Sequence, residues 1–307
     1  MKYKCIAYTL GAYGVILLLA ACLSPMIFAC VQYLNVHYTC DFLAYLAHKP
    51  FEQYFDRCRL FSVFLTFPML LRCFQVRWTE FNVQLNLRTL SIGIKCFALG
   101  IGLWLSFLVL IAYNIGLPEL KNMSHPLLHT IVFATIASIL LACMEEIIFR
   151  GLLFRFFLKN MSEFWSIHWI SLIFACLHFS NVRTLNVHCV LALKGFYSAF
   201  YSLADIFTHV QWIYFFNLYT LSCLLCLWVL KLKTLWGAIG FHAGLVFTLM
   251  YIRQHYYFSD VVHNRWGTGR ITDSWAVLCI LLLITVAMWR MRIRSNFPKM
   301  GLVEHLK

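Results

Sequence analysis

Three charged side chains lie within a long apolar stretch of the sequence. The segment MEEIIFRG, residues 144–151, contains Glu145, Glu146 and Arg150, and apolar residues surround it from 127 to 158. Each charge in the middle of a membrane costs about 2.5–3.5 kcal/mol unless it faces the protein interior and finds a partner. In a helix, Glu146 and Arg150 are about 40° apart and can form an ion pair. Glu145 lies about 140° from Arg150, so its carboxylate can point elsewhere.

Two histidines occupy other apolar stretches at a similar expected depth. Phe174 and His178 are four positions apart and share one helical face, and His242 lies in the centre of the stretch 234–252. A carboxylate in apolar surroundings suits general base catalysis on water, while imidazoles can orient it, move protons or polarise a carbonyl group. Glu145, His178 and His242 are therefore candidate catalytic residues.

Two other interpretations of these residues remain open. The charged side chains could form a polar knot that only holds helices together, and a single buried histidine is usually a packed core residue. Glu145, His178 and His242 could also bind a metal ion such as zinc with open coordination positions. The sequence does not decide whether a metal takes part, and our first expectation is a site without a cofactor.

The composition indicates a membrane protein. Of the 307 residues, 62% are hydrophobic and 12% are charged, about half the charged fraction of a soluble domain. The net charge of +13 comes from 25 Lys and Arg against 12 Asp and Glu, and the basic residues gather in short loops and at the C-terminus. This pattern is typical of the positive-inside rule and of anionic lipid headgroups. We therefore expect the lipid bilayer as a partner, and no nucleic acid.

Nine apolar stretches are candidate helices, near residues 5–33, 60–75, 91–115, 127–158, 164–180, 187–206, 210–230, 234–252 and 274–291. Lys2 and Lys4 place the N-terminus in the cytoplasm, and the basic segments near 72–95, 155–159, 231–233 and 290–294 mark further cytoplasmic ends. This alternation allows only one crossing between residues 181 and 231, so we assign 187–206 to an interfacial or re-entrant segment. The prediction is an all-α polytopic fold of one domain, 1–307, with about eight transmembrane helices, both ends in the cytoplasm and an intramembrane catalytic site.

The N-terminus and the cysteines are interpreted as ordinary parts of a membrane protein. The first residues resemble a signal peptide, and the segment 19–22 resembles a lipoprotein cleavage site, but the apolar run continues to about Val31 and predicts a retained first helix. The 13 cysteines are scattered along apolar segments, and Cys223 and Cys226 form the only CxxC pair. We interpret them as small buried apolar residues, with neither disulfides nor a zinc site.

These residues resemble a known family at three motifs. Glu145 to Arg150 fits EExxxR, Phe174 to His178 fits FxxxH, and His242 begins the third motif, inside LKTLWGAIGFHAG. In order and spacing this pattern is similar to the CPBP family of CAAX proteases and bacteriocin-processing enzymes. The family is also called type II CAAX prenyl endopeptidases or Abi proteins, and its members are polytopic intramembrane proteases. The resemblance covers about residues 127–252, the expected family core.

The resemblance implies a role for each motif residue. It makes Glu145 the base that activates water with the help of His178, makes Glu146 and Arg150 a structural ion pair, and gives His242 a part in binding the oxyanion. The sequence departs from the family pattern at Val246, where the family often has Asn. Losing an oxyanion donor typically costs about 10²–10³ in rate, so this position puts the activity in doubt.

We therefore expect an intramembrane endopeptidase, a hydrolase that cleaves a membrane-anchored or lipidated peptide or protein with water activated by glutamate. The first alternative is a catalytically silent family member that acts in binding or in bacteriocin self-immunity, which Val246 favours. The second is a proton-coupled transporter that uses the same Glu and His residues; the lack of an internal repeat argues against it. The expected location is a bacterial inner membrane.

Overall fold

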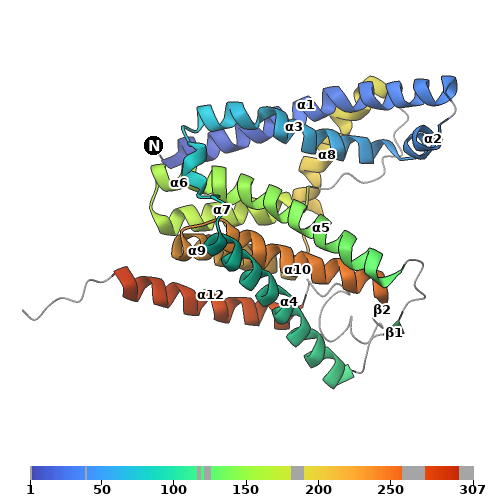
Figure 1. Ribbon diagram of the computed structural model, residues 1–307. Helices are drawn as coiled ribbons and strands as arrows, with labels where there is room; N and C mark the ends of the chain where they lie inside the picture. Colours follow the sequence, from blue (N-terminus) through green and yellow to red (C-terminus); the bar gives the residue numbers. More distant parts are fainter. Residues whose placement is uncertain are drawn as a thin grey trace, which may run out of the picture. The chain divides into compact units, whose positions relative to one another are not determined.

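The computed structural model describes residues 2–38, 40–115, 119–120, 126–180, 190–257 and 274–296. The chain divides into two compact units (Figure 1). Unit 1 takes its residues from 1–78, 155–163 and 172–210, and unit 2 from 79–154, 164–171 and 211–307. The helix α7 (Glu163–Leu177) contributes residues to both units.

Unit 1 is built around three long helices. Its elements are α1 (Lys2–His37), α2 (Asp41–Ala47), α3 (Phe51–Cys73), α6 (Phe154–Asn160), α8 (Leu191–Thr208) and the end of α7. The small residues Ala20 and Ala21 of α1 are buried against Phe55 of α3. On the other side, a Cβ atom at Gly195 of α8 would lie 2.0 Å from the carbonyl oxygen of Ala21, so only glycine allows this approach. Small side chains thus let α1 pack closely on both of its neighbours.

A buried polar network ties these helices to the end of α7. Arg59 of α3 donates hydrogen bonds to the carbonyl oxygen of Ser180 at 2.5 Å and to the hydroxyl oxygens of Ser180 and Ser202 at 3.0 and 3.2 Å. Tyr13 of α1 bonds the Ser180 hydroxyl at 2.6 Å. Ser180 lies two residues after His178, so the network fixes the backbone that carries this histidine.

Unit 2 surrounds the helix α10 (Trp236–His255), which packs against α4 (Leu87–Ile115) and α5 (Leu127–Glu146). A π-helical segment, Ile147–Leu153, continues α5, and α9 (Trp212–Leu232) packs against α12 (Trp275–Asn296). A 3₁₀ turn at Trp78–Phe81 leads into the unit. The two short strands β1 (Glu119–Leu120) and β2 (Tyr256–Tyr257) pair antiparallel.

Glycines bring α4 and α10 into backbone contact. A Cβ atom at Gly240 would lie 2.1 Å from the carbonyl oxygen of Gly93, and one at Gly244 would lie 2.2 Å from that of Phe97. From the other helix, a Cβ atom at Gly100 would lie 2.4 Å from the carbonyl oxygen of Phe241. The spacing of Gly240 and Gly244 is the GxxxG pattern of close helix pairs in membranes. Since His242 lies between these glycines, their contacts set its position.

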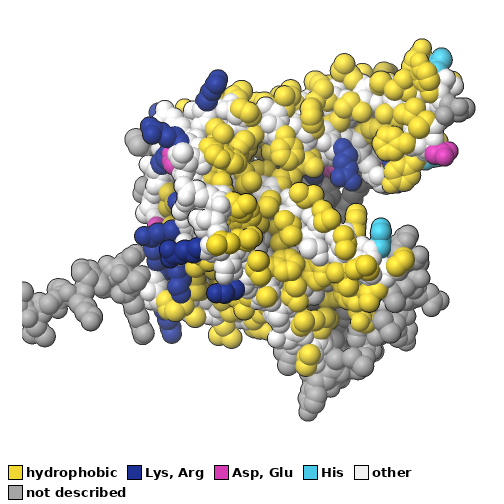
Figure 2. Space-filling model, viewed as in Figure 1, with side chains coloured by type: hydrophobic (Ala, Val, Ile, Leu, Met, Phe, Trp, Pro, Cys, Tyr) yellow, Lys and Arg dark blue, Asp and Glu magenta, His cyan; other side chains and the backbone are white. Residues whose placement is uncertain are grey.

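The all-α membrane fold is confirmed. Among the described residues, five helical stretches are long and apolar enough to cross a membrane, at Lys4–His37, Leu87–Val109, Leu127–Asn160, Trp212–Leu232 and Trp275–Arg292, and α7 is a shorter apolar helix. Figure 2 shows hydrophobic side chains over much of the helical surface, as a lipid-facing protein requires. The count of eight spans, the orientation, the interfacial place of 187–206 and the single domain stay predictions.

The cysteines agree with the sequence only in part. The twelve cysteines within the described ranges are all free thiols. Five of them are exposed at the protein surface rather than buried: Cys22, Cys30, Cys40, Cys73 and Cys279. Our expectation of burial was wrong at these positions. Cys22, Cys30 and Cys279 lie on candidate spans, where an apolar side chain can face lipid as well as protein, while Cys40 precedes α2 and Cys73 ends α3.

Candidate active site

The two adjacent glutamates lie where an α-helix ends and a π-helix begins. Glu145 and Glu146 are the last residues of α5, and the π-helical segment begins at the next residue. Such segments are often found at functional sites. Gly151 within it allows close packing, because a Cβ atom there would lie 2.8 Å from the ring of Phe81. The sequence analysis assumed a continuous α-helix and did not foresee this change.

Glu146 and Arg150 form a fully buried ion pair. The guanidinium Nη1 of Arg150 donates to Oε1 of Glu146 at 2.9 Å, and both side chains have 0% exposure. The other nitrogen, Nη2, donates to the hydroxyl of Ser222 on α9 at 2.9 Å. The pair therefore links the segment after α5 to α9 in the core of unit 2.

His242 of α10 lies between both glutamates. Its Nδ1 is 2.8 Å from Oε1 of Glu146, and its Nε2 is 3.8 Å from Oε2 of Glu145. A carboxylate can only accept, so Nδ1 carries the hydrogen of this bond. In a neutral imidazole, Nε2 then has a lone pair and faces Glu145. The helical spacing had suggested that the two acids point to different partners, but they share this imidazole.

The two glutamates differ in access. The side chain of Glu145 retains 17% exposure, whereas that of Glu146 has none. Glu146 is held by Arg150 and His242 in the interior. Glu145 is therefore the more accessible of the two acids, although its Oε2 atom, which faces His242, is itself buried.

His178 follows α7 and belongs to unit 1, so its participation in a site with Glu145 stays a prediction. Its local geometry explains the FxxxH spacing. The Nδ1 atom lies 2.8 Å from the carbonyl oxygen of Phe174, and the two rings lie 4.4 Å apart. Because the carbonyl oxygen accepts the Nδ1 hydrogen, the neutral ring carries its lone pair on Nε2.

Val246 lies on α10 one turn after His242 and is half-buried. Its isopropyl group offers no hydrogen-bond donor, so the position where the family often has Asn is apolar in this chain. Any second donor for an oxyanion would have to come from another residue.

The donor set does not assemble a metal centre within the described residues. Among them, no group of three or more His, Cys, Asp and Glu side chains is arranged to hold a metal ion. Glu145 and His242 are two of the expected zinc ligands, and His178, the third, belongs to unit 1. A catalytic zinc takes three protein ligands, so we assign no step of the chemistry to a metal.

The sequence analysis missed Ser222 as a partner of Arg150. Its hydroxyl is fully buried in the apolar helix α9, where it satisfies one of the guanidinium hydrogens. A lone serine in a span is a weak signal, because such a hydroxyl can also bond its own backbone. The sequence analysis also did not single out Arg59, which donates hydrogen bonds to Ser180 just after α7.

Comparison with known proteins gives one match. Residues 127–248 match the family model described as type II CAAX prenyl endopeptidase Rce1-like. This range contains the π-helical segment, both glutamates and the three histidine and arginine positions of the motifs. No curated protein and no solved structure matches the chain.

Proposed function

Since residues 127–248 match the model of the Rce1-like type II CAAX prenyl endopeptidases, we propose that the chain is a member of this family and that it hydrolyses a peptide bond within the membrane. The substrate is a membrane-anchored or lipidated peptide or protein. The matched family acts on such substrates, and the apolar helices keep the enzyme in the same bilayer. A bacterial inner membrane is the proposed location.

Glu145 is the proposed general base. The observation that carries this assignment is the difference in access, because Glu145 is partly exposed while Glu146 is sealed in its ion pair. A water molecule beside Glu145 gives one proton to the carboxylate while its oxygen attacks the carbonyl carbon of the scissile bond. The proton then passes to Nε2 of His242 while the oxyanion exists, and from there to the leaving amine as the C–N bond breaks.

The charges of the cluster suit this proton transfer. Two carboxylates and one guanidinium sum to −1, so taking up one proton makes the group neutral. The neutral cluster is the more stable form to hold away from water. Glu146 and Arg150 thus act as the fixed part of the site, and Glu145 as the part that changes charge.

His242 has two roles that depend on its protonation. While neutral, it donates only to Glu146 and presents a lone pair on Nε2. When Nε2 receives the proton taken up by Glu145, 3.8 Å away, the imidazolium can donate to the oxyanion. His178 is the proposed second imidazole, which assists proton transfer through its Nε2 atom.

A second candidate function is supported by Val246. Without the amide donor, the protein could bind a membrane partner and leave it uncut, as a silent family member would. The two candidates differ in one measurable product, the cleaved peptide.

The test is a cleavage assay with the full chain in proteoliposomes and a farnesylated peptide that ends in a CAAX sequence. We expect wild-type protein to release the C-terminal tripeptide and Glu145→Gln to lose this activity, because an amide cannot accept the proton. Thermal unfolding of both proteins checks that the variant is folded. Activity that survives Glu145→Gln refutes the assigned base, and no product from the wild type favours the binding function. The same assay with a zinc chelator added to the wild-type protein tests the zinc alternative, which predicts that activity is lost.

A further inference from the structure

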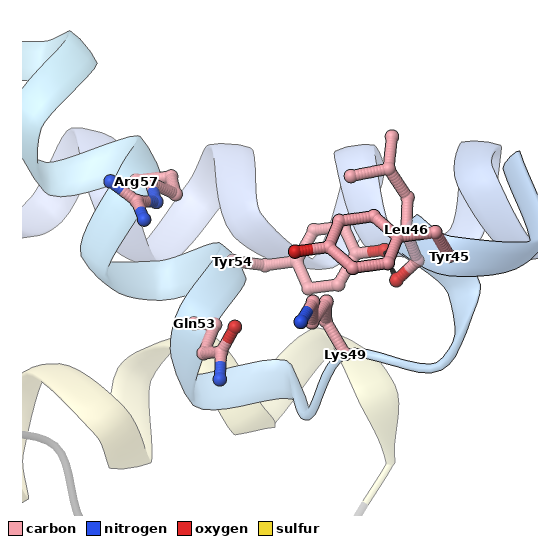
Figure 3. A pocket seen from close by; sticks show the side chains of 6 residues that line it. All are labelled: Tyr45, Leu46, Lys49, Gln53, Tyr54 and Arg57. Carbon is pink, nitrogen blue, oxygen red and sulfur yellow. Dashed lines mark hydrogen bonds between the residues drawn. The ribbon is translucent and has the colours of Figure 1, made fainter. Parts of the chain in front are cut away.

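A cavity of about 310 Å³ lies where α2 turns into α3, wholly within unit 1 (Figure 3). Its lining residues are Tyr45, Leu46, Lys49, Gln53, Tyr54 and Arg57. The volume is at the lower end of the range for small-molecule sites, about 300–1,000 Å³. The cavity therefore has room for a small polar group rather than for a folded segment or a long peptide.

The lining is positively charged. It includes the ammonium of Lys49 and the guanidinium of Arg57 and contains no carboxylate. Asp56, on the same turn of α3, forms an ion pair with Arg59 at 3.0 Å and is not part of the lining. A ligand in the cavity thus meets two positive charges, which match the charge of about −1.5 to −2 on a phosphate monoester.

The wall of the cavity is held in place before any ligand binds. The hydroxyl of the buried Tyr54 donates to the carbonyl oxygen of Leu46 at 2.7 Å and fastens α3 to α2. The ammonium of Lys49 lies 4.1 Å from the centre of the Tyr45 ring, and Figure 3 shows it pointing toward the tyrosines. This cation–π contact limits the flexibility of a side chain that is otherwise mobile.

The cavity lies next to the end of a membrane span. The candidate span in α1 ends at His37, and α2 begins at Asp41. Tyr38 and Phe42, between and beside them, are 61% and 65% exposed. Exposed aromatic residues at the end of a span mark the headgroup level of the bilayer. By the predicted topology this is the external headgroup level, where a basic pocket can meet the headgroups of anionic lipids in that leaflet.

We propose that this cavity binds the phosphate headgroup of an anionic membrane lipid, with Lys49 and Arg57 on the phosphate and Tyr38 and Phe42 beside its acyl chains. Inorganic phosphate shares the headgroup chemistry but lacks the acyl chains. The lipid is favoured because the exposed aromatic side chains Tyr38 and Phe42, near the cavity in the sequence, would otherwise face water. This site is separate from the proposed catalytic residues and does not depend on the proposed function.

The test uses the full chain in nanodiscs of phosphatidylcholine with or without phosphatidic acid, and native mass spectrometry counts the retained lipid. Lys49→Met with Arg57→Met should weaken phosphatidic acid retention about thirtyfold, since each basic residue near the surface contributes about 1 kcal/mol. The exchange Lys49→Arg with Arg57→Lys should keep it. The control Arg88→Met with Lys95→Met removes the same charge from exposed positions of α4 and should retain the lipid.

Three outcomes would overturn the proposal. Equal loss in the cavity variant and in the α4 control would mean general charge attraction. Displacement of the lipid by millimolar inorganic phosphate would mean a free phosphate site. If the cavity variant has the unfolding temperature of the wild type and still retains phosphatidic acid, the lipid binds elsewhere. If the double variant does not fold, Arg57→Gln alone, at the exposed rim, gives the same comparison with a smaller expected loss.

Discussion

His242 lies close to both Glu145 and Glu146, and the hydrogen on its Nδ1 atom determines which proton transfers its Nε2 atom can make. Its Nδ1–H is committed to Glu146, so Nε2 can accept a proton first and donate one only afterwards. Glu146 thereby orients the imidazole that faces Glu145, while it also neutralises Arg150. A single buried carboxylate thus sets both the tautomer of the histidine and the position of the arginine.

The two glutamates should respond differently to the same substitution. Glu146→Gln leaves Arg150 buried without its anionic partner, which should lower the free energy of unfolding by about 3–5 kcal/mol. Glu145→Gln, at a partly exposed position, should cost much less. Thermal and denaturant unfolding in detergent measure both. Equal losses at both positions would show that the four residues form only a structural knot.

The apolar position after His242 gives a second pair of variants. If the protein is an active protease, His242→Ala should lower kcat by at least about 10²-fold, because Val246 supplies no donor. Val246→Asn places an amide one turn along the same face and should keep or raise kcat. The amide is half-buried, so the unfolding temperature of this variant is the control. A His242→Ala enzyme that cuts at the normal rate would exclude the role assigned to the imidazole.

For single residues, the sequence was most informative about which charged side chains pair along one helix. The pairing of Glu146 with Arg150 follows from a four-residue spacing, and the structure has that ion pair at 2.9 Å. The convergence of Glu145 on His242 did not follow, because spacing along one helix says nothing about which side chain a second helix supplies. Ser222 and Arg59 were missed for the same reason, since their partners lie 72 and 121 residues away.

Among the elements, the crossing of α4 and α10 is the most demanding contact. The backbones meet at Gly93 and Gly240, and the next contact, one turn along, joins Phe97 and Gly244. Packing of this kind depends on the absence of side chains rather than on their presence. It holds α10 at the depth where His242 meets the end of α5.

A methyl group at this crossing should separate the helices. Gly240→Ala would place a Cβ atom 2.1 Å from a backbone oxygen, and we expect a loss of about 1–3 kcal/mol or more in unfolding free energy and a fall in activity. Gly102→Ala on α4 is the matched control, because a Cβ atom there meets nothing within 4 Å. It should be neutral or slightly stabilising. Equal behaviour of the two variants would contradict the close crossing.

The π-helical segment marks the limit of periodicity arguments. A fixed rotation of about 100° per residue describes α-helices, and it was applied across residues 145–150, where the helix changes type. No residue in IIFRGLL demands this change by itself. The close packing of Gly151 on Phe81, which joins segments distant in the sequence, is a tertiary contact that the local pattern does not encode.

For the molecule as a whole, the number of crossings is the open prediction with the widest effect. A reporter fused after Lys233 should be cytoplasmic, and one at Asn181, which lies outside the described residues, should be external. The last turn of α9 is basic, and the positive-inside rule places such an end in the cytoplasm. If both reporters lie on the same side, the segment 187–206 crosses the membrane and the count of eight is wrong.

The length of α1 bears on which membrane suits the protein. Its 36 residues extend about 54 Å at 1.5 Å per residue, whereas the hydrocarbon core of a bilayer is about 30 Å thick. Even a tilt of about 40° leaves a projection of about 41 Å. The helix must therefore stretch the surrounding lipids or push its last turns among the headgroups. Hydrophobic mismatch costs fractions of a kcal/mol per Å and depends on the apolar stretch, near residues 5–33, rather than on the whole helix. Upright, this stretch extends about 44 Å, so α1 should favour a thick bilayer unless it is strongly tilted.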